Sequence, residues 1–176
     1  VQSNDRQAVR DAVGFLIAQG HTRIGLVEGP DGFRSALERR EGWRDALEAH
    51  GLPCGPELMA RGNYTFETGK EAGDALLSLA ERPSAIFASN DVMAAGVVHV
   101  ARARGLDVPG DVSIVGFDDT AIAATIWPPL TTVRWPIRTM ARSAALKLIH
   151  PEKAEAEQSV FPTEFVPRAS TAAPRG

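Results

Sequence analysis

The amino-acid sequence predicts an α/β fold in which a parallel sheet is flanked by helices on both faces. Short apolar runs alternate with amphipathic stretches of about a dozen residues, a pattern typical of right-handed βαβ units. Glycines recur where these stretches end, as expected at helix C-termini. The run 112–115 is nearly all apolar, as expected when helices cover both faces of a sheet.

The first elements are marked by capping residues. Ser3 or Asn4 can cap a helix that ends at Gly20, and its apolar stripe consists of Val9, Ala12, Val13, Leu16 and Ile17. A strand is predicted over 24–27. Residues 35–38 (SALE) then form a capping box, which predicts the start of a second helix.

The same alternation continues through the middle of the chain. An extended segment over 58–60 precedes a helix whose apolar side holds Ala72, Leu76, Leu77 and Ala80. A strand over 85–88 precedes a helix over 92–104, and the strand 112–115 follows. We expect the next segment, 118–129, to be a long loop with one helical turn.

The C-terminal part begins with an extended piece over 131–133. A helix is predicted over 137–149, with a buried side made of Met140, Ala144 and Leu148. Residues 151–158 form a charged, alanine-rich connector, and 160–166 are predicted to be the last strand.

Composition and charge exclude several functional classes. The chain has 176 residues, a net charge of -3 and no basic stripe, so this segment alone is not expected to bind DNA. No apolar run is long enough to span a membrane, and the first residues lack the blocks of a signal peptide. A single cysteine, Cys54, permits no intrachain disulfide, which suits a reducing compartment.

Signatures of common enzyme and metal sites are missing from the sequence. The segment 62–71 lacks the glycine spacing and the Ser or Thr of a phosphate loop, and neither GxGxxG nor GxSxG occurs. The histidines have no metal-ligand spacing. We therefore expect no catalysed reaction, no cofactor and no bound metal.

Polar residues follow the predicted strands, where ligands bind in open parallel sheets. Tyr64, Asn90 and Asp118 follow successive strands, while Ser35 and Arg39 open the helix after the first strand. An amide, a carboxylate and a guanidinium offer donors and acceptors that suit sugar hydroxyls or the polar edge of a nucleobase. We therefore expect a site for a small polar molecule at this rim, with Tyr64 covering an apolar face.

The same residues also have purely structural interpretations. Asn90 or Asp91 can cap the following helix, and Asp118 can satisfy backbone groups of its loop. Arg39 can be a solvated helix residue. The adjacent carboxylates Asp118 and Asp119 are expected to point apart, which argues against shared acid-base chemistry or a metal pair.

Several blocks of sequence occur in a recognisable order: 20–24 (GHTRI), 29–30 (GP), 39–43 (RREGW), 89–94 (SNDVMA), 108–119 (VPGDVSIVGFDD) and 128–133 (PPLTTV). Together they resemble the transcription regulators of the lactose-repressor (LacI/GalR) type over nearly the whole chain. The resemblance implies a two-lobed, periplasmic-binding-protein-like effector domain in a cytoplasmic regulator. Operator DNA would be bound only by a helix-turn-helix headpiece outside this chain.

The resemblance also implies a division of the chain between the two lobes. Residues 1–134 would form the C-terminal lobe, with the chain starting near the first crossover. The helix and connector over 135–159 would belong to the N-terminal lobe, and 160–176 would return as a final strand and tail.

Functional residues are implied by the same resemblance. The effector, a sugar or related small polar metabolite, would contact Ser35, Arg39, Tyr64, Asn90 and Asp118. A homodimer would form through Met93, Val97 and Ile126, although Met93 and Val97 can also be ordinary core residues. Two alternatives stay open: an exported sugar-binding receptor of a transport system with the same fold, and an α/β enzyme that uses Asp118.

Overall fold

The computed structural model describes residues 1–150 and 160–175. Its central sheet has four parallel strands in the order β3-β2-β4-β5. These strands are β2 (Ile24–Glu28), β3 (Met59–Arg61), β4 (Ala85–Ala88) and β5 (Ser113–Val115). The predicted α/β class is confirmed.

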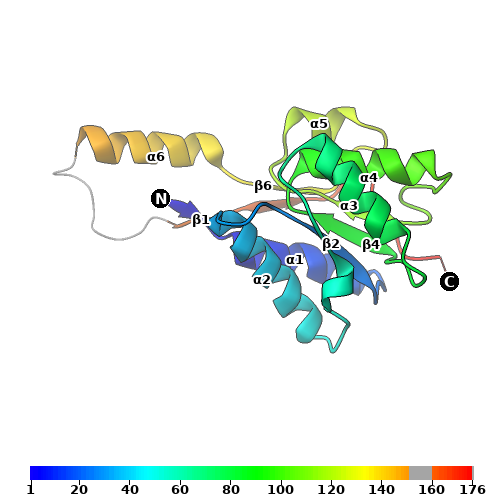
Figure 1. The fold of residues 1–176 in the computed structure, drawn as a ribbon. Helices are drawn as coiled ribbons and strands as arrows, with labels where there is room; N and C mark the ends of the chain where they lie inside the picture. The colour runs from blue at the N-terminus through cyan, green and yellow to red at the C-terminus, as the bar shows by residue number, and fades with distance from the viewer. Residues whose placement is uncertain (151–159, 176) are drawn as a thin grey trace.

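Two helices cover each face of the sheet (Figure 1). On one face lie α1 (Asp5–Ala18) and α2 (Arg34–Glu48), and on the other lie α3 (Phe66–Leu77) and α4 (Asp91–Ala103). Side chains alternate between the two cores because successive residues of a strand face opposite ways. Thus Ile24 and Leu26 pack with α1 and α2, whereas Val27 packs with α3 and α4.

Short elements complete the chain around this sheet. The 3-10 helix η1 (Pro56–Leu58) leads into β3, and the predicted helical turn is α5 (Ala121–Thr125). β6 (Thr132–Arg134) pairs antiparallel with β8 (Glu164–Val166), and β1 (Gln2–Ser3) pairs parallel with β7 (Val160–Phe161). These paired segments lie between the main body and α6 (Ile137–Ile149), which projects away from it (Figure 1).

The sequence misplaced several local features. The capping box is absent, because α2 begins at Arg34 and Ser35 already lies inside its first turn. Asn4 occupies the N-cap of α1 without capping it, since its Oδ1 accepts a hydrogen bond from the Thr163 amide instead. The single strand predicted over 160–166 is two strands, and the connector predicted over 151–158 lies outside the described residues.

The buried side predicted for α6 is wrong in part. Met140 is 8% exposed and Ala144 is half-buried, but Leu148 is 84% exposed. Ile137, Leu146 and Ile149 are also exposed. The exposed apolar residues of α6 therefore form a face that no other described residue covers. None of the described helices is both long and apolar enough to cross a membrane.

Glycines allow α3 and α4 to pack closely. A Cβ on Gly96 of α4 would collide with the carbonyl oxygen of Phe66, and one on Gly73 of α3 would lie 3.1 Å from Val97 Cα. Met93 and Val97 are fully buried in the core beneath α3. The prediction that these two residues form a dimer interface is therefore wrong, because they face α3 of their own chain.

We expect Gly96→Ala to destabilise the fold by about 1–3 kcal/mol, because its methyl group must displace the backbone of α3. Urea denaturation measures this change. Gly14→Ala is the matched control: its Cβ would meet nothing within 4 Å, and alanine is the better helix former. Equal effects of the two substitutions would contradict the close packing of α3 on α4.

Candidate functional site

The guanidinium of Arg39 lies buried at the carboxyl ends of the strands. Its Nε donates a hydrogen bond to Asp5 Oδ2 at 2.8 Å, and its Nη1 donates to the Ser89 carbonyl oxygen at 2.5 Å. The guanidinium carbon lies 3.7 Å from the centroid of the Phe117 ring, a cation–π arrangement. Arg39 is therefore not a solvated helix residue, and it joins α2 to α1, β4 and β5.

Asp118 faces the free side of this guanidinium. One of its carboxylate oxygens, Oδ1, lies 3.8 Å from Arg39 Nη2, close enough for electrostatic attraction but too far for a direct hydrogen bond. Its side chain is 22% exposed. Burial raises the pKa of Asp118 from 3.8 to about 7; the charge of Arg39 opposes this shift, while those of Asp91 and Asp5 add to it.

Tyr64 joins the other predicted site residues. Its hydroxyl lies 3.4 Å from Ser35 Oγ, and its carbonyl oxygen accepts a hydrogen bond from Asn90 Nδ2 at 3.2 Å. The phenol ring packs so tightly over Gly29 that a Cβ there would lie 2.5 Å from the hydroxyl oxygen. Phe33 meets the same ring edge-on, with 6.1 Å between centroids.

Asn90 has the structural role that the sequence left open. Its Oδ1 caps α4 by accepting a hydrogen bond from the Met93 amide at 2.8 Å. The amide nitrogen bonded to Tyr64 has a second N–H, which leaves one donor for another partner. The Ser89 carbonyl oxygen, at the end of β4, accepts a hydrogen bond from Arg39. Asn90 is the next residue in the chain, so it lies next to the pair formed by Arg39 and Asp118. The structure thus gathers all five predicted residues at one rim.

The neighbouring acids differ from Asp118. Asp119 points away from it, as expected, and pairs with Arg134 and Arg168. Asp91 is fully buried and accepts hydrogen bonds from Thr120 and Thr132. Among residues 1–150 and 160–175, no three His, Cys, Asp or Glu side chains are grouped so that they could hold a metal ion.

Two residues of the site were missed by sequence reasoning. Asp5 neutralises Arg39 from 34 positions away in the chain, and Phe117 lies under the guanidinium. Nothing in the sequence around Asp5 distinguishes it from an ordinary acidic residue in the first turn of a helix. A hollow of about 490 Å³ lies beside the rim; Asp5 and Ser35 line it, together with Trp135 and Met140.

The rim offers complementary groups for hydroxyl-bearing molecules. The buried guanidinium of Arg39 is already paired with Asp5. No side chain among the described residues donates a hydrogen bond to the Asp118 carboxylate, so its oxygens can accept hydrogen bonds from a ligand. A ligand hydroxyl placed in the 3.8 Å gap could accept from Arg39 and donate to Asp118. Fold and site together are those of a small-molecule-binding α/β domain.

Comparison with known proteins identifies the family. Residues 13–171 match the model of the periplasmic binding protein-like domain. The probable repressor ExuR of Bacillus subtilis is 39% identical over 173 residues, which are 97% of this chain and 52% of that protein. The chain belongs to the periplasmic binding protein-like domain family, in the form found in LacI-type transcription regulators.

Solved structures agree with this assignment. A sugar-binding LacI-family regulator from Escherichia coli, in complex with phosphate, has a TM-score of 0.89 at 34% identity and covers 98% of this chain and 63% of its own. The regulator CelR in complex with cellobiose has a TM-score of 0.87 at 35% identity, over 96% of this chain and 52% of its own. The chain thus spans about half the length of CelR and of ExuR.

We expect Asp118→Asn to stabilise the protein above pH 7. Between about pH 4 and pH 7 the unfolded chain releases the Asp118 proton while the folded chain keeps it, so stability falls as pH rises through this window. Asparagine removes that penalty, which we expect to be about 1–2 kcal/mol at pH 8 because water reaches part of the carboxyl group.

Urea denaturation of both proteins from pH 3.5 to pH 8 measures the difference. The curves of Asp118→Asn and the parent protein should converge at the acid end. A difference that does not change with pH would contradict the raised pKa of Asp118.

Proposed function

We propose that this chain is the effector-binding domain of a DNA-binding transcription regulator and that its rim binds a sugar or a related small polar metabolite. The pair formed by Arg39 and Asp118 carries the proposal, since it presents a fixed cation and an incompletely satisfied carboxylate across 3.8 Å. Tyr64 supplies an apolar ring beside the pair. The cellobiose complex of CelR, a protein of similar fold, supports this class of ligand.

The proposed mechanism is a shift between two arrangements of the lobes. A molecule that contacts this rim and the opposing lobe binds the closed arrangement more tightly, and this difference in affinity changes the affinity for operator DNA. DNA would be bound by a headpiece outside this chain. No reaction, cofactor or metal is required, and the regulator would act in the cytoplasm.

The division of the chain between two lobes is part of the proposal. Residues 1–134 and 160–176 would belong to the C-terminal lobe, and 135–159 to the N-terminal lobe. The exposed apolar residues of α6, among them Leu148 and Ile149, support this division. A helix at the protein surface usually has polar residues on its solvent-exposed side, and an exposed apolar face marks a contact with another part of the protein.

We also propose a homodimer, through a surface that includes Ile126 and Trp127. Ile126 is half-buried and packs on the core beneath α4, while the neighbouring Trp127 is 72% exposed. Tryptophan is enriched among the residues that contribute most to binding at protein interfaces.

In the full-length protein, a sugar of the effector class should raise the melting temperature, because a ligand that binds only the folded state stabilises it. A panel of cellobiose, ribose, glucose and cytidine, read by thermal shift, provides the first probes. At pH 8, where most Asp118 is ionised, Asp118→Asn should weaken binding of the active compound about 10-fold or more by calorimetry, since a charged acceptor is lost.

Asp74→Asn is the matched control for ligand binding. Asp74 is exposed near the far end of α3 and pairs with Arg104, so its substitution should leave affinity unchanged. Equal affinities of the parent protein and Asp118→Asn for the active compound would reject the assigned rim.

Trp127→Ser should shift the full-length protein from dimer to monomer in sedimentation velocity, because it removes a large apolar contact. Leu37→Ser is the control, since Leu37 is 48% exposed on α2 and away from α5. An unchanged dimer in Trp127→Ser would place the interface elsewhere.

A further inference from the structure

The turn that presents Asp118 has an unfavourable backbone conformation. Asp118 has a φ of 115° and Asp119 a φ of 55°, so two consecutive residues other than glycine lie in the left-handed region. Such conformations are unfavourable and persist only where their surroundings hold them. The contacts of this turn therefore determine where the Asp118 carboxylate lies.

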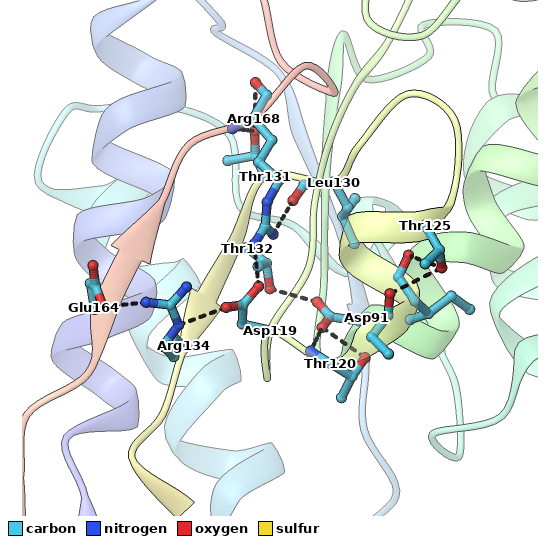
Figure 2. Close-up of polar contacts among 12 residues, drawn as sticks. Asp91, Asp119, Thr120, Thr125, Leu130, Thr131, Thr132, Arg134, Glu164 and Arg168 are labelled. Atoms are coloured by element: carbon cyan, nitrogen blue, oxygen red, sulfur yellow. Dashed lines mark hydrogen bonds and ion pairs between the residues drawn. The ribbon is translucent and has the colours of Figure 1, made fainter.

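Asp119 holds the turn through ion pairs with two arginines, Arg134 and Arg168 (Figure 2). Its Oδ2 accepts a hydrogen bond from Arg134 Nε at 2.6 Å, and its Oδ1 accepts from Arg168 Nη2 at 2.6 Å. The Asp119 side chain is only 9% exposed. Burial would raise the pKa of Asp119, but hydrogen bonds from Arg168 and Arg134 outweigh burial and lower it. We call Asp119, Arg134 and Arg168 the Asp119 clamp.

The clamp is anchored in the segments that connect the main body with α6 and β7. Arg134 ends β6 and also donates to Glu164 of β8 at 2.8 Å (Figure 2). Arg168, just after β8, donates from Nη1 to the Leu130 carbonyl oxygen at 2.9 Å. The turn is also joined to β6 through its backbone, since the Asp118 amide donates to the Val133 carbonyl oxygen at 2.8 Å.

Asp91 holds the other end of the same turn. Its Oδ2 accepts from the Thr120 amide at 2.7 Å and its Oδ1 from Thr132 Oγ1 at 2.5 Å (Figure 2). Asp91 follows Asn90 at the start of α4, so this contact relates the turn to another residue of the rim. Three successive residues of the turn therefore face three different places: Asp118 the rim, Asp119 the crossover segments and Thr120 the start of α4.

We propose that the Asp119 clamp positions the Asp118 carboxylate beside Arg39 and makes that position depend on the crossover segments β6 and β8. This inference rests on the proposed function in assigning a ligand to Asp118. A relative movement of β6 and β8 would shift Arg134 and Arg168. Because both arginines pair with the Asp119 carboxylate, the neighbouring Asp118 would move with them. By linkage, a ligand that holds Asp118 favours one arrangement of these strands.

The acid titration of Asp118 reports its position without any ligand. Its pKa of about 7 arises from burial beside Arg39, with Asp91 and Asp5 nearby. If the clamp is broken and the turn relaxes, the carboxyl group gains water and its pKa moves toward the ordinary 3.8. The direct effect of removing arginine charges is opposite, because losing a nearby cation raises the pKa of an acid.

The sign of the change therefore separates positioning from electrostatics. We expect the double variant Arg134→Gln/Arg168→Gln to lower the titration midpoint of Asp118 by about one pH unit or more. The measurement is the carboxyl 13C shift of Asp118 against pH in the 176-residue protein, with the resonance assigned by its loss in Asp118→Asn. An unchanged or raised midpoint in the folded double variant would overturn the proposal.

Further variants keep the proposal testable if the double variant does not fold. Arg168→Gln alone removes one ion pair and should lower the midpoint less, so it replaces the double variant if that does not fold. Arg168→Lys keeps the charge and should restore most of the parent midpoint. Arg104→Gln, which breaks the exposed pair with Asp74 far from the turn, should not move it.

The outcomes of this test and of the ligand screen are independent. A clamp without effect on Asp118 would leave the proposed ligand class intact. Failure to find any ligand would remove the role of Asp118 in binding and leave the measured positioning unchanged.

Discussion

The buried guanidinium of Arg39 is the constraint on which the site depends. A charge that is 5% exposed must be compensated where it lies, and the structure supplies Asp5, the Ser89 carbonyl oxygen and the face of Phe117. These partners come from α1, the end of β4 and the end of β5. Satisfying one cation thus fixes the relative positions of three elements at the edge of the sheet where their loops meet.

The same compensation gives the rim its chemical character. Asp5 already makes the close ion pair with Arg39, so Asp118 is attracted to the cation without bonding to it. A ligand with neighbouring hydroxyl groups can form hydrogen bonds with both Arg39 and Asp118, as the proposed sensor function requires. The turn that carries Asp118 is held on its other side by Asp119, which pairs with Arg134 of β6 and with Arg168 just after β8, so one short stretch of chain joins the site to these strands.

Most of the sheet and the rim could be predicted from the sequence because both follow from local patterns. Apolar runs gave the position of β4, and the parallel arrangement forces Tyr64, Asn90 and Asp118 to one edge. Long-range partners could not be predicted: no local signal joins Asp5 to Arg39. Met93 and Val97 could be core or interface residues by sequence alone, because Gly73 and the rest of α3, which covers them, lie far from them in the chain. Leu148 was assigned to a buried side by periodicity alone, which does not say what covers that side.

The most direct test of the central claim is a crystal structure of the full-length protein with a compound that raises its melting temperature. The account predicts a ligand hydroxyl within about 3 Å of both an Asp118 carboxylate oxygen and Arg39 Nη2, with the ligand ring or carbon skeleton against Tyr64. Density for the compound in another hollow, with Arg39 and Asp118 still 3.8 Å apart and untouched, would contradict it.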